Sequence, residues 1–311
     1  MDVLAEALRV SGARGALGFM LEAGETWGLW LDDYPGAALH VVARGTPWFH
    51  IAGERPVQAR AGDAVLLSPG TAHGIASGPD VTMGACDVES AARARANGSV
   101  YRLGLPPART ELITVHYEQD PAVSTPVLTA LARPMHIEAR ENPGLERTIE
   151  LLTTELAQPR IGTTAAVNSI VDLLLIQFIR AWLARAPRER SGSWLGAMRD
   201  PVVRDALACI HAEPERPWTT ETLATTISVS RATLSRHFRA ALGQTPGAYV
   251  TQWRMDLASL RLRDTDEPVE AISGAVGYGS PHAFSRAFRR ARGMAPGEYR
   301  THLRARTGLG R

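Results

Sequence analysis

The feature that most constrains this 311-residue chain is an internal repeat in its last third. The segment LSRHFRAALGQTPGAY (234–249) aligns with FSRAFRRARGMAPGEY (284–299) at an offset of 50 residues, and nine of the 16 positions are identical. About one identity is expected by chance if residue usage is near uniform. The repeat therefore predicts a duplicated supersecondary unit.

The first copy has the pattern of a helix-turn-helix motif. Thr219 or Thr220 can cap a short helix, and Ser230 can cap a second helix over 231–241, with the bend 227–229 between them. Apolar residues recur four positions apart on the second helix, which is typical of a face that packs on a core. The arginines then lie on the outer face.

The second copy repeats this arrangement. The short helix is expected over 269–276 and the bend over 277–279, and Ser280 is expected to cap the second helix. Pro281 would be the first residue of that helix, a position that suits proline. Residues 201–311 carry 16 arginines against 10 acids, a net charge of +6 in a chain of net charge +2. This excess predicts an acidic partner, and arginine can bind both guanine edges and phosphates.

Residues 201–304 resemble the DNA-binding domain of the AraC/XylS family of bacterial transcription regulators. The motifs that carry the resemblance are VSRATLSRHFRAALGQTPGAYVTQWRMDLA and VGYGSPHAFSRAFRRARGMAPGEYR. The resemblance implies two recognition helices that enter successive major grooves of promoter DNA. It places the base-reading positions at Arg231, Ala232, Ser235 and Arg236, and at Pro281, His282, Ala283 and Arg286. We expect Arg239 and Arg289, one turn later, to touch phosphates, and Thr233 and Arg290 are further candidate DNA contacts.

The first bend departs from the family pattern, which usually has a glycine where this chain has Ser228. If the backbone there is left-handed, the serine stores strain of about 1 kcal/mol. In the second copy Ser273 replaces the usual alanine and Gly274 lies inside the short helix, which weakens that helix by about 1 kcal/mol.

The N-terminal part has a different pattern. Short apolar runs separated by Gly, Pro and Asp over residues 15–120 predict an all-β sandwich or barrel, with a hairpin between Trp48 and Val57. The segments LHVVARGTPWFHI and AGDAVLLSPGTAHGI resemble the cupin-like sensor domain found in this family. In metal-binding cupins the histidine at the place of His73 is a ligand, and His40 lies near the first ligand motif.

A divalent metal in this domain remains one of two alternatives. Cupin metal sites need three or four ligands, and Ala38 stands where a glutamate is expected. His50, Cys86 and His116 are further candidates. In the other alternative, His40 and His73 bind an effector or pack inside the barrel, in a pocket walled by Trp27 and Trp48.

The segment 144–185 has helical periodicity, and its second helix is apolar on nearly all sides. Asp172 and Gln177 interrupt its apolar run, which argues against a membrane span. We therefore predict an α+β multidomain chain: a cupin-like β-barrel sensor (1–140), a helical dimerisation region (141–185), a linker (186–200) and an all-α tandem helix-turn-helix domain (201–311).

The function predicted is a transcription regulator, an effector-responsive activator in the leading interpretation. Its expected partners are promoter DNA, a second copy of the chain, RNA polymerase and a small-molecule effector, with no membrane. The first residues lack a signal-peptide layout, and Cys86 and Cys209 have no metal or redox spacing, so a cytoplasmic protein is expected. The alternative is a metal-dependent cupin enzyme with an accessory helical domain.

Overall fold

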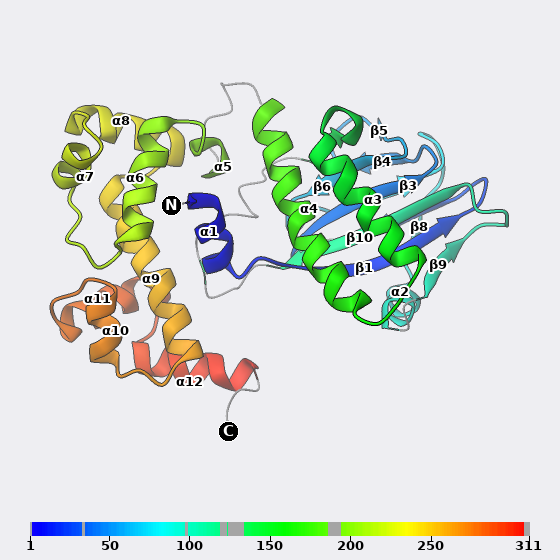
Figure 1. Cartoon of the computed structure of the whole chain (residues 1–311). Helices are drawn as coiled ribbons and strands as arrows, with labels where there is room; N and C mark the ends of the chain where they lie inside the picture. The colour runs from blue at the N-terminus through cyan, green and yellow to red at the C-terminus, as the bar shows by residue number, and fades with distance from the viewer. Residues whose placement is uncertain are drawn as a thin grey trace. The chain divides into compact units, whose positions relative to one another are not determined.

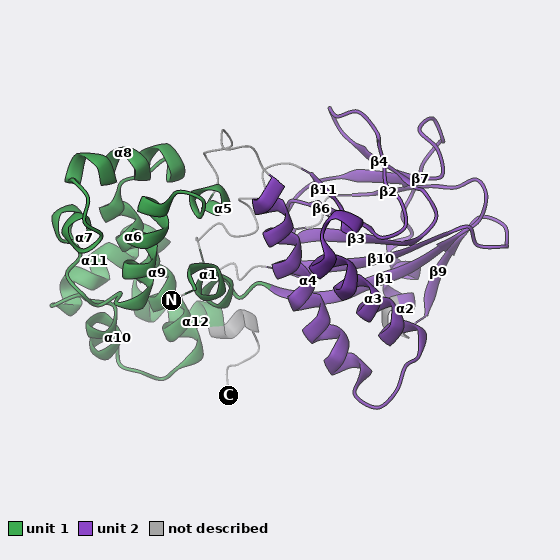
Figure 2. Ribbon diagram, turned by 45° about the horizontal axis from the view of Figure 1, so that its top comes forward, with its two compact units in different colours: residues 1–13, 119–127, 188–311 green, residues 14–118, 128–187 purple. Residues whose placement is uncertain are grey.

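A computed structural model of the chain describes residues 2–32, 35–96, 99–118, 123, 134–185 and 194–307. These residues divide into two compact units, shown in different colours in Figure 2. The β-sheet unit comprises residues 14–118 and 134–185. The helical unit comprises residues 194–307 together with 2–13 and Val123.

The β-sheet unit contains two sheets. The larger has the order β11-β6-β3-β10-β1-β9 and the smaller the order β5-β4-β7-β2-β8. The strands are β1 (Arg14–Ala23), β2 (Gly28–Leu31), β3 (Ala37–Arg44), β4 (Trp48–Ile51), β5 (Val57–Gln58), β6 (Asp63–Leu67), β7 (His73–Ala76), β8 (Gly84–Ala85), β9 (Val100–Leu103), β10 (Thr110–Glu118) and β11 (Met135–Glu138). The expected hairpin is confirmed, because β4 pairs antiparallel with β5.

The core of this unit lies between the two sheets. Strands of the larger sheet contribute Leu21, Val65 and Leu112, and strands of the smaller sheet contribute Phe49 and Ile75. Side chains of a strand alternate between its two faces. Strand β3 is buried on both faces because its inner face meets this core and its outer face lies under helices.

Helices α3 (Pro143–Ala157) and α4 (Thr163–Arg185) cover the outer face of the larger sheet (Figure 1). The Tyr117 hydroxyl of β10 donates a hydrogen bond to the Val171 carbonyl of α4 at 2.8 Å. The amide of Gly15 donates to the carboxylate of Asp172 at 3.2 Å, which explains the acid within this apolar helix. By length and composition α4 is apolar enough to cross a membrane, and its Leu174 and Phe178 are fully buried within the sheet unit.

The helical unit contains the two repeat copies. Its helices are α5 (Trp194–Ala197), α6 (Pro201–Ala212), α7 (Thr220–Thr226), α8 (Arg231–Leu242), α9 (Pro246–Asp264), α10 (Val269–Ala275), α11 (Pro281–Arg292) and α12 (Pro296–Thr307). Helices α7 and α8 form the first helix-turn-helix motif, and α10 and α11 form the second. The long helix α9 contacts α8, α10 and α11, and so joins the two motifs.

The helix boundaries follow from capping residues. The Thr219 hydroxyl accepts from the amide of Thr222, and the Ser230 hydroxyl accepts from the amide of Thr233 at 3.0 Å. Helices α8 and α11 both end at a left-handed glycine, Gly243 or Gly293. The expected cap at Ser280 is wrong in one respect: Ser280 occupies the N-cap position, but its side chain makes no capping hydrogen bond.

The two turns differ in length by one residue. In the first, Ser228 has φ 58° and two residues separate it from α8; in the second, Gly277 has φ 79° and three residues separate it from α11. In both, the residue after the left-handed position donates its amide to a carbonyl five residues earlier, Val229 to Ala224 and Tyr278 to Ser273. The left-handed backbone considered for Ser228 is therefore present.

Two helices were not foreseen from the sequence, α1 (Val3–Ser11) and α2 (Val88–Ala96). Helix α1 precedes the first strand, yet it belongs to the helical unit and packs on α6 and α9. Its buried face consists of Val3, Ala7 and Val10. The structure thus groups residues 2–13 with the C-terminal helices, whereas the sequence placed them in the sensor domain, and it groups α3 and α4 with the sheets.

Candidate functional site

The exposed face of α8 carries the first set of predicted DNA contacts. Packing sets this face, because Leu234 and Phe238 are fully buried and orient the helix. The outward positions hold the predicted residues Arg231, Ala232, Ser235, Arg236 and Arg239, all of which are exposed, while Thr233 is half-buried beside the N-cap.

Helix α11 repeats this arrangement in the second motif. Phe284 and Phe288 are fully buried and take the places of Leu234 and Phe238. The exposed predicted positions are His282, Arg286, Arg289 and Arg290, whereas Pro281 and Ala283 are half-buried. The structure therefore brings four arginines into equivalent outward positions on the two helices: Arg236, Arg239, Arg286 and Arg289.

The arginines of this unit fall into two groups. Among the described residues, Arg236, Arg239, Arg286, Arg289 and Arg290 have no carboxylate within salt-bridge distance. Other arginines are bound inside the unit: Arg292 pairs with the buried Asp256 and donates to the Ser259 hydroxyl at 3.0 Å, and Arg254 and Arg300 donate to main-chain carbonyls. The first group holds cations that a polyanion can bind, and the second holds the fold together.

Arg231 is intermediate between these groups. Nη1 of Arg231 lies 3.9 Å from Oε2 of Glu221, the second residue of α7. Both side chains are about 70% exposed (70% and 73%), so water surrounds the pair. An exposed pair at this distance is weak.

The two histidines predicted for the sensor domain meet inside the sheet unit. Nε2 of His40 on β3 and Nε2 of His73 on β7 are 2.9 Å apart, and both side chains are buried. His40 Nδ1 lies 3.0 Å from the Thr114 hydroxyl, and His73 Nδ1 lies 3.0 Å from the Thr71 carbonyl. The pair thus links the two sheets through a single line of hydrogen bonds.

The hydrogen-bond partners determine which ring nitrogen of each histidine carries the proton. The Thr71 carbonyl can only accept, so Nδ1 of His73 carries its proton and Nε2 is an acceptor. His40 must then donate from Nε2, and its Nδ1 accepts from the Thr114 hydroxyl. Burial lowers the pKa of His40 well below its usual value, and the nearby His73 and His116 lower it further. Burial also lowers the pKa of His73, although its bond to Thr71 opposes the change. Both rings are neutral at pH 7.

This donor set does not fit a divalent cation. Among the described residues, no three His, Cys, Asp or Glu side chains are grouped so that they could hold a metal ion. His50 alternates with the inward-facing Phe49 and therefore lies on the outer face of its sheet, and neither His116 nor Cys86 completes a set. The histidine pair is better described as a hydrogen-bonded element of the barrel interior than as a metal centre.

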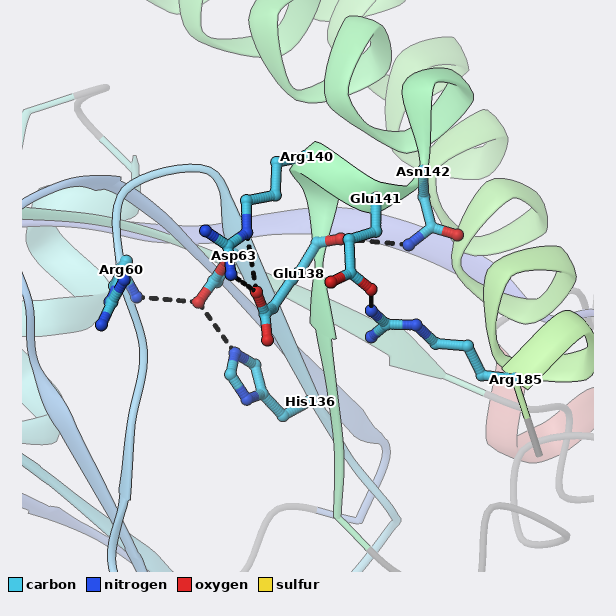
Figure 3. Close-up of polar contacts among 8 residues, drawn as sticks. All are labelled: Arg60, Asp63, His136, Glu138, Arg140, Glu141, Asn142 and Arg185. Atoms are coloured by element: carbon cyan, nitrogen blue, oxygen red, sulfur yellow. Dashed lines mark hydrogen bonds and ion pairs between the residues drawn. The ribbon is translucent and has the colours of Figure 1, made fainter. Parts of the chain in front are cut away.

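A second polar cluster, which the sequence did not single out, lies at the β11 edge of the larger sheet (Figure 3). The Asp63 carboxylate accepts from the Arg60 amide and from Nε2 of His136, each at 2.9 Å. Glu138 pairs with Arg140, which lowers the pKa of Glu138. The contacts of Asp63 hold the edge strand β11 to the start of β6 and to the turn before it, which is a structural role.

Comparison with known proteins agrees with both units. A family model described as "Cupin" matches residues 2–184, and one described as "Helix-turn-helix domain" matches residues 223–302. A Streptomyces lividans protein described as "Putative AraC-like transcription regulator" is 34% identical over 97% of this chain and 99% of its own length. A Streptomyces antibioticus protein of the same description is 33% identical over the same shares. The "HTH-type transcriptional regulator AlkR" of Acinetobacter baylyi is 31% identical over 84% of this chain and 86% of its own.

A cupin unit joined to two helix-turn-helix motifs defines a DNA-binding transcription regulator. The chain belongs to the AraC/XylS family of these regulators, with an N-terminal cupin domain. The similarity extends over nearly the whole chain, and it favours the regulator over the metal-dependent cupin enzyme considered from the sequence. Its partner is double-stranded DNA.

Proposed function

We propose that the protein binds promoter DNA through α8 and α11, each placed in one of two successive major grooves. The observation that carries the proposal is the equivalence of the two exposed helices. Each is oriented by two buried apolar side chains and presents at least two exposed arginines that have no carboxylate within salt-bridge distance in the described part of the chain. Arginine in this setting can donate two hydrogen bonds to a guanine edge.

The proposed contacts divide by position along each helix. Residues of the first two turns approach base edges, and those one turn further approach phosphates. Base-edge contacts are assigned to Arg231, Ala232, Thr233, Ser235 and Arg236, and to Pro281, His282, Ala283 and Arg286; phosphate contacts are assigned to Arg239, Arg289 and Arg290. Half-burial limits Thr233, Pro281 and Ala283 to their outer atoms.

We further propose that the sheet unit senses a small molecule and that the regulator is an effector-responsive activator. His40, His73 and the Thr114 hydroxyl form a line of polar groups beside the apolar core between the sheets. A ligand that enters between the sheets and bonds either ring must replace their mutual hydrogen bond. Only a ligand that distinguishes two states of the protein can shift their populations, and breaking this bond provides such a difference.

Assembly as a homodimer through α3 and α4 is part of the proposal. Leu151 on α3 and Leu173 on α4 are 50% and 39% exposed, so each helix presents an apolar side chain that a second copy of the chain could cover. A dimer bound to DNA would contact RNA polymerase in the cytoplasm. Light scattering of the full chain and of Leu151→Glu/Leu173→Glu tests this part, and a monomeric wild-type chain at micromolar concentration would refute it.

The DNA-binding assignment is tested with a duplex selected by the wild-type chain from a random pool. Arg236→Ala and Arg286→Ala should each weaken binding to this duplex by about 1–3 kcal/mol and relax the preference at one base position. The matched control is Arg204→Ala, because Arg204 is also an exposed arginine of the helical unit but lies on α6, outside α8 and α11. If both recognition-helix variants bind the selected duplex like wild type, α8 and α11 do not read bases.

A further inference from the structure

Glu221 is an anion placed on the surface proposed to bind a polyanion. It is the second residue of α7, and its carboxylate lies 3.9 Å from the guanidinium of Arg231, the first residue of α8. Any group this close to a base-reading arginine lies within a few ångströms of the DNA. In helix-turn-helix docking the first helix also crosses the phosphate backbone, so the start of α7 approaches phosphates.

The second motif supplies a natural comparison. Glu270 is the second residue of α10, as Glu221 is of α7, and it is also exposed. The residue of α11 that corresponds to Arg231 is Pro281, which carries no charge. Both motifs therefore carry an acid at the same place, but among the described residues only Glu221 has an arginine within salt-bridge distance.

The pair affects the two modes of DNA binding differently. Non-specific binding relies on cations that replace the counterions of phosphates. An arginine with a carboxylate beside it contributes less to this exchange, and the carboxylate itself repels nearby phosphates. In a specific complex, paired hydrogen bonds to a base edge compete more effectively for the guanidinium. Because the pair is loose and exposed, Arg231 can leave Glu221 when such a base is present.

We propose that Glu221 is a specificity-determining residue. It weakens the binding of Arg231 to phosphates in DNA of any sequence, and Arg231 leaves it when a matching base edge binds the guanidinium. This inference rests on the proposed placement of α8 in the major groove. It assigns to α7 a role in discrimination beyond that of a supporting helix.

The test measures DNA affinity by fluorescence anisotropy over a salt series, with the full-length protein and two probes. One probe is a random-sequence duplex of 30 base pairs, and the other is the duplex selected by the wild-type chain. Exposed ion pairs are worth up to about 1 kcal/mol. Glu221→Gln should accordingly tighten binding to the random duplex about threefold, with a slope of log affinity against log salt that is steeper by up to about 0.9. The selected duplex should gain less, so the specificity ratio falls.

Two further variants separate this effect from a general change of surface charge. In a background of Arg231→Ala, Glu221→Gln should tighten binding to the random duplex less than it does in wild type, because only the repulsion between the carboxylate and the phosphates is then relieved. Glu270→Gln should also tighten binding less than Glu221→Gln does. Equal gains from the two glutamine variants, a gain of the same size with and without Arg231, or no gain at all would overturn the inference while wild type still binds DNA. If Arg236→Ala and Arg286→Ala both bind the selected duplex like wild type, the proposed role of the helices fails instead. Far-UV circular dichroism verifies that each exposed substitution leaves the fold intact.

Discussion

The left-handed serine in the first turn gives a sharp test of how the motif is built. Ser228 has φ 58° and is exposed. Ser228→Gly should therefore stabilise the helical unit without loss of packing. The reverse change is available in the second turn, where Gly277 has φ 79° and a Cβ would lie 2.5 Å from the Glu215 carbonyl oxygen.

The expected magnitudes follow from two opposing effects. A non-glycine residue in the left-handed region costs about 1–2 kcal/mol of strain. Glycine avoids this strain, but it lowers stability by about 0.5–1 kcal/mol because it increases the conformational entropy of the unfolded chain. Ser228→Gly should therefore add about 0.5–1 kcal/mol to the free energy of unfolding. Gly277→Ser adds both strain and the clash with Glu215, so it should lose about 2–4 kcal/mol.

Chemical denaturation and calorimetry of the full-length protein measure both changes. A gain of 1 kcal/mol should raise the Tm of the helical unit by roughly 4 °C. Ser228→Ala is the control, because it keeps the left-handed residue and should change stability by less than about 0.5 kcal/mol. The reasoning fails if Ser228→Gly is no more stable than Ser228→Ala, or if Gly277→Ser unfolds like wild type.

Three other outcomes are expected. Arg292→Ala should lower the free energy of unfolding by about 3–5 kcal/mol, because it leaves the fully buried Asp256 without its partner; a loss below 1 kcal/mol in urea denaturation would contradict this. Because the pKa values of His40 and His73 are lowered by burial, the unfolded chain binds more protons than the folded chain below about pH 6.5. The free energy of unfolding of the sheet unit should thus be highest above that pH. It should fall by up to about 1.4 kcal/mol per pH unit for each ring as the pH decreases below it. Urea midpoints that are constant between pH 7 and 5 would refute the burial of the pair. Arg239→Ala should weaken binding to random and selected duplexes equally and reduce the salt slope by about 1, whereas a loss confined to the selected duplex would make Arg239 a base reader.

Much of the helical unit could be predicted from sequence because its signals are local. The caps at Thr219 and Ser230 and the spacing of Leu234 and Phe238 act within a few residues of each other. The duplication then made each signal appear twice. The same logic failed at Ser280, where proline sets the start of α11 and the serine side chain is not used as a cap.

The candidate sites were predicted in part. His40 and His73 were expected from the resemblance to point into one pocket, and the structure brings the two rings into direct contact. Their other partners could not be inferred, since Thr114 lies 74 residues from His40 in the chain. The cluster of Asp63 and His136 was missed for the same reason, because the two residues are 73 apart.

The sequence by itself determined that this chain carries two helix-turn-helix motifs behind a β-rich domain, because periodicity, caps and a repeat are encoded by near neighbours. Tertiary structure alone decided which arginines are exposed and which are bound to other groups of the protein. Arg290 and Arg292 are two residues apart on one helix, yet the first is exposed and the second is held by the buried Asp256 of α9. Tertiary structure also placed Glu221 beside Arg231 and docked α1 on the C-terminal helices. Such contacts depend on which faces pack together, and packing joins residues whose distance along the chain gives no local signal.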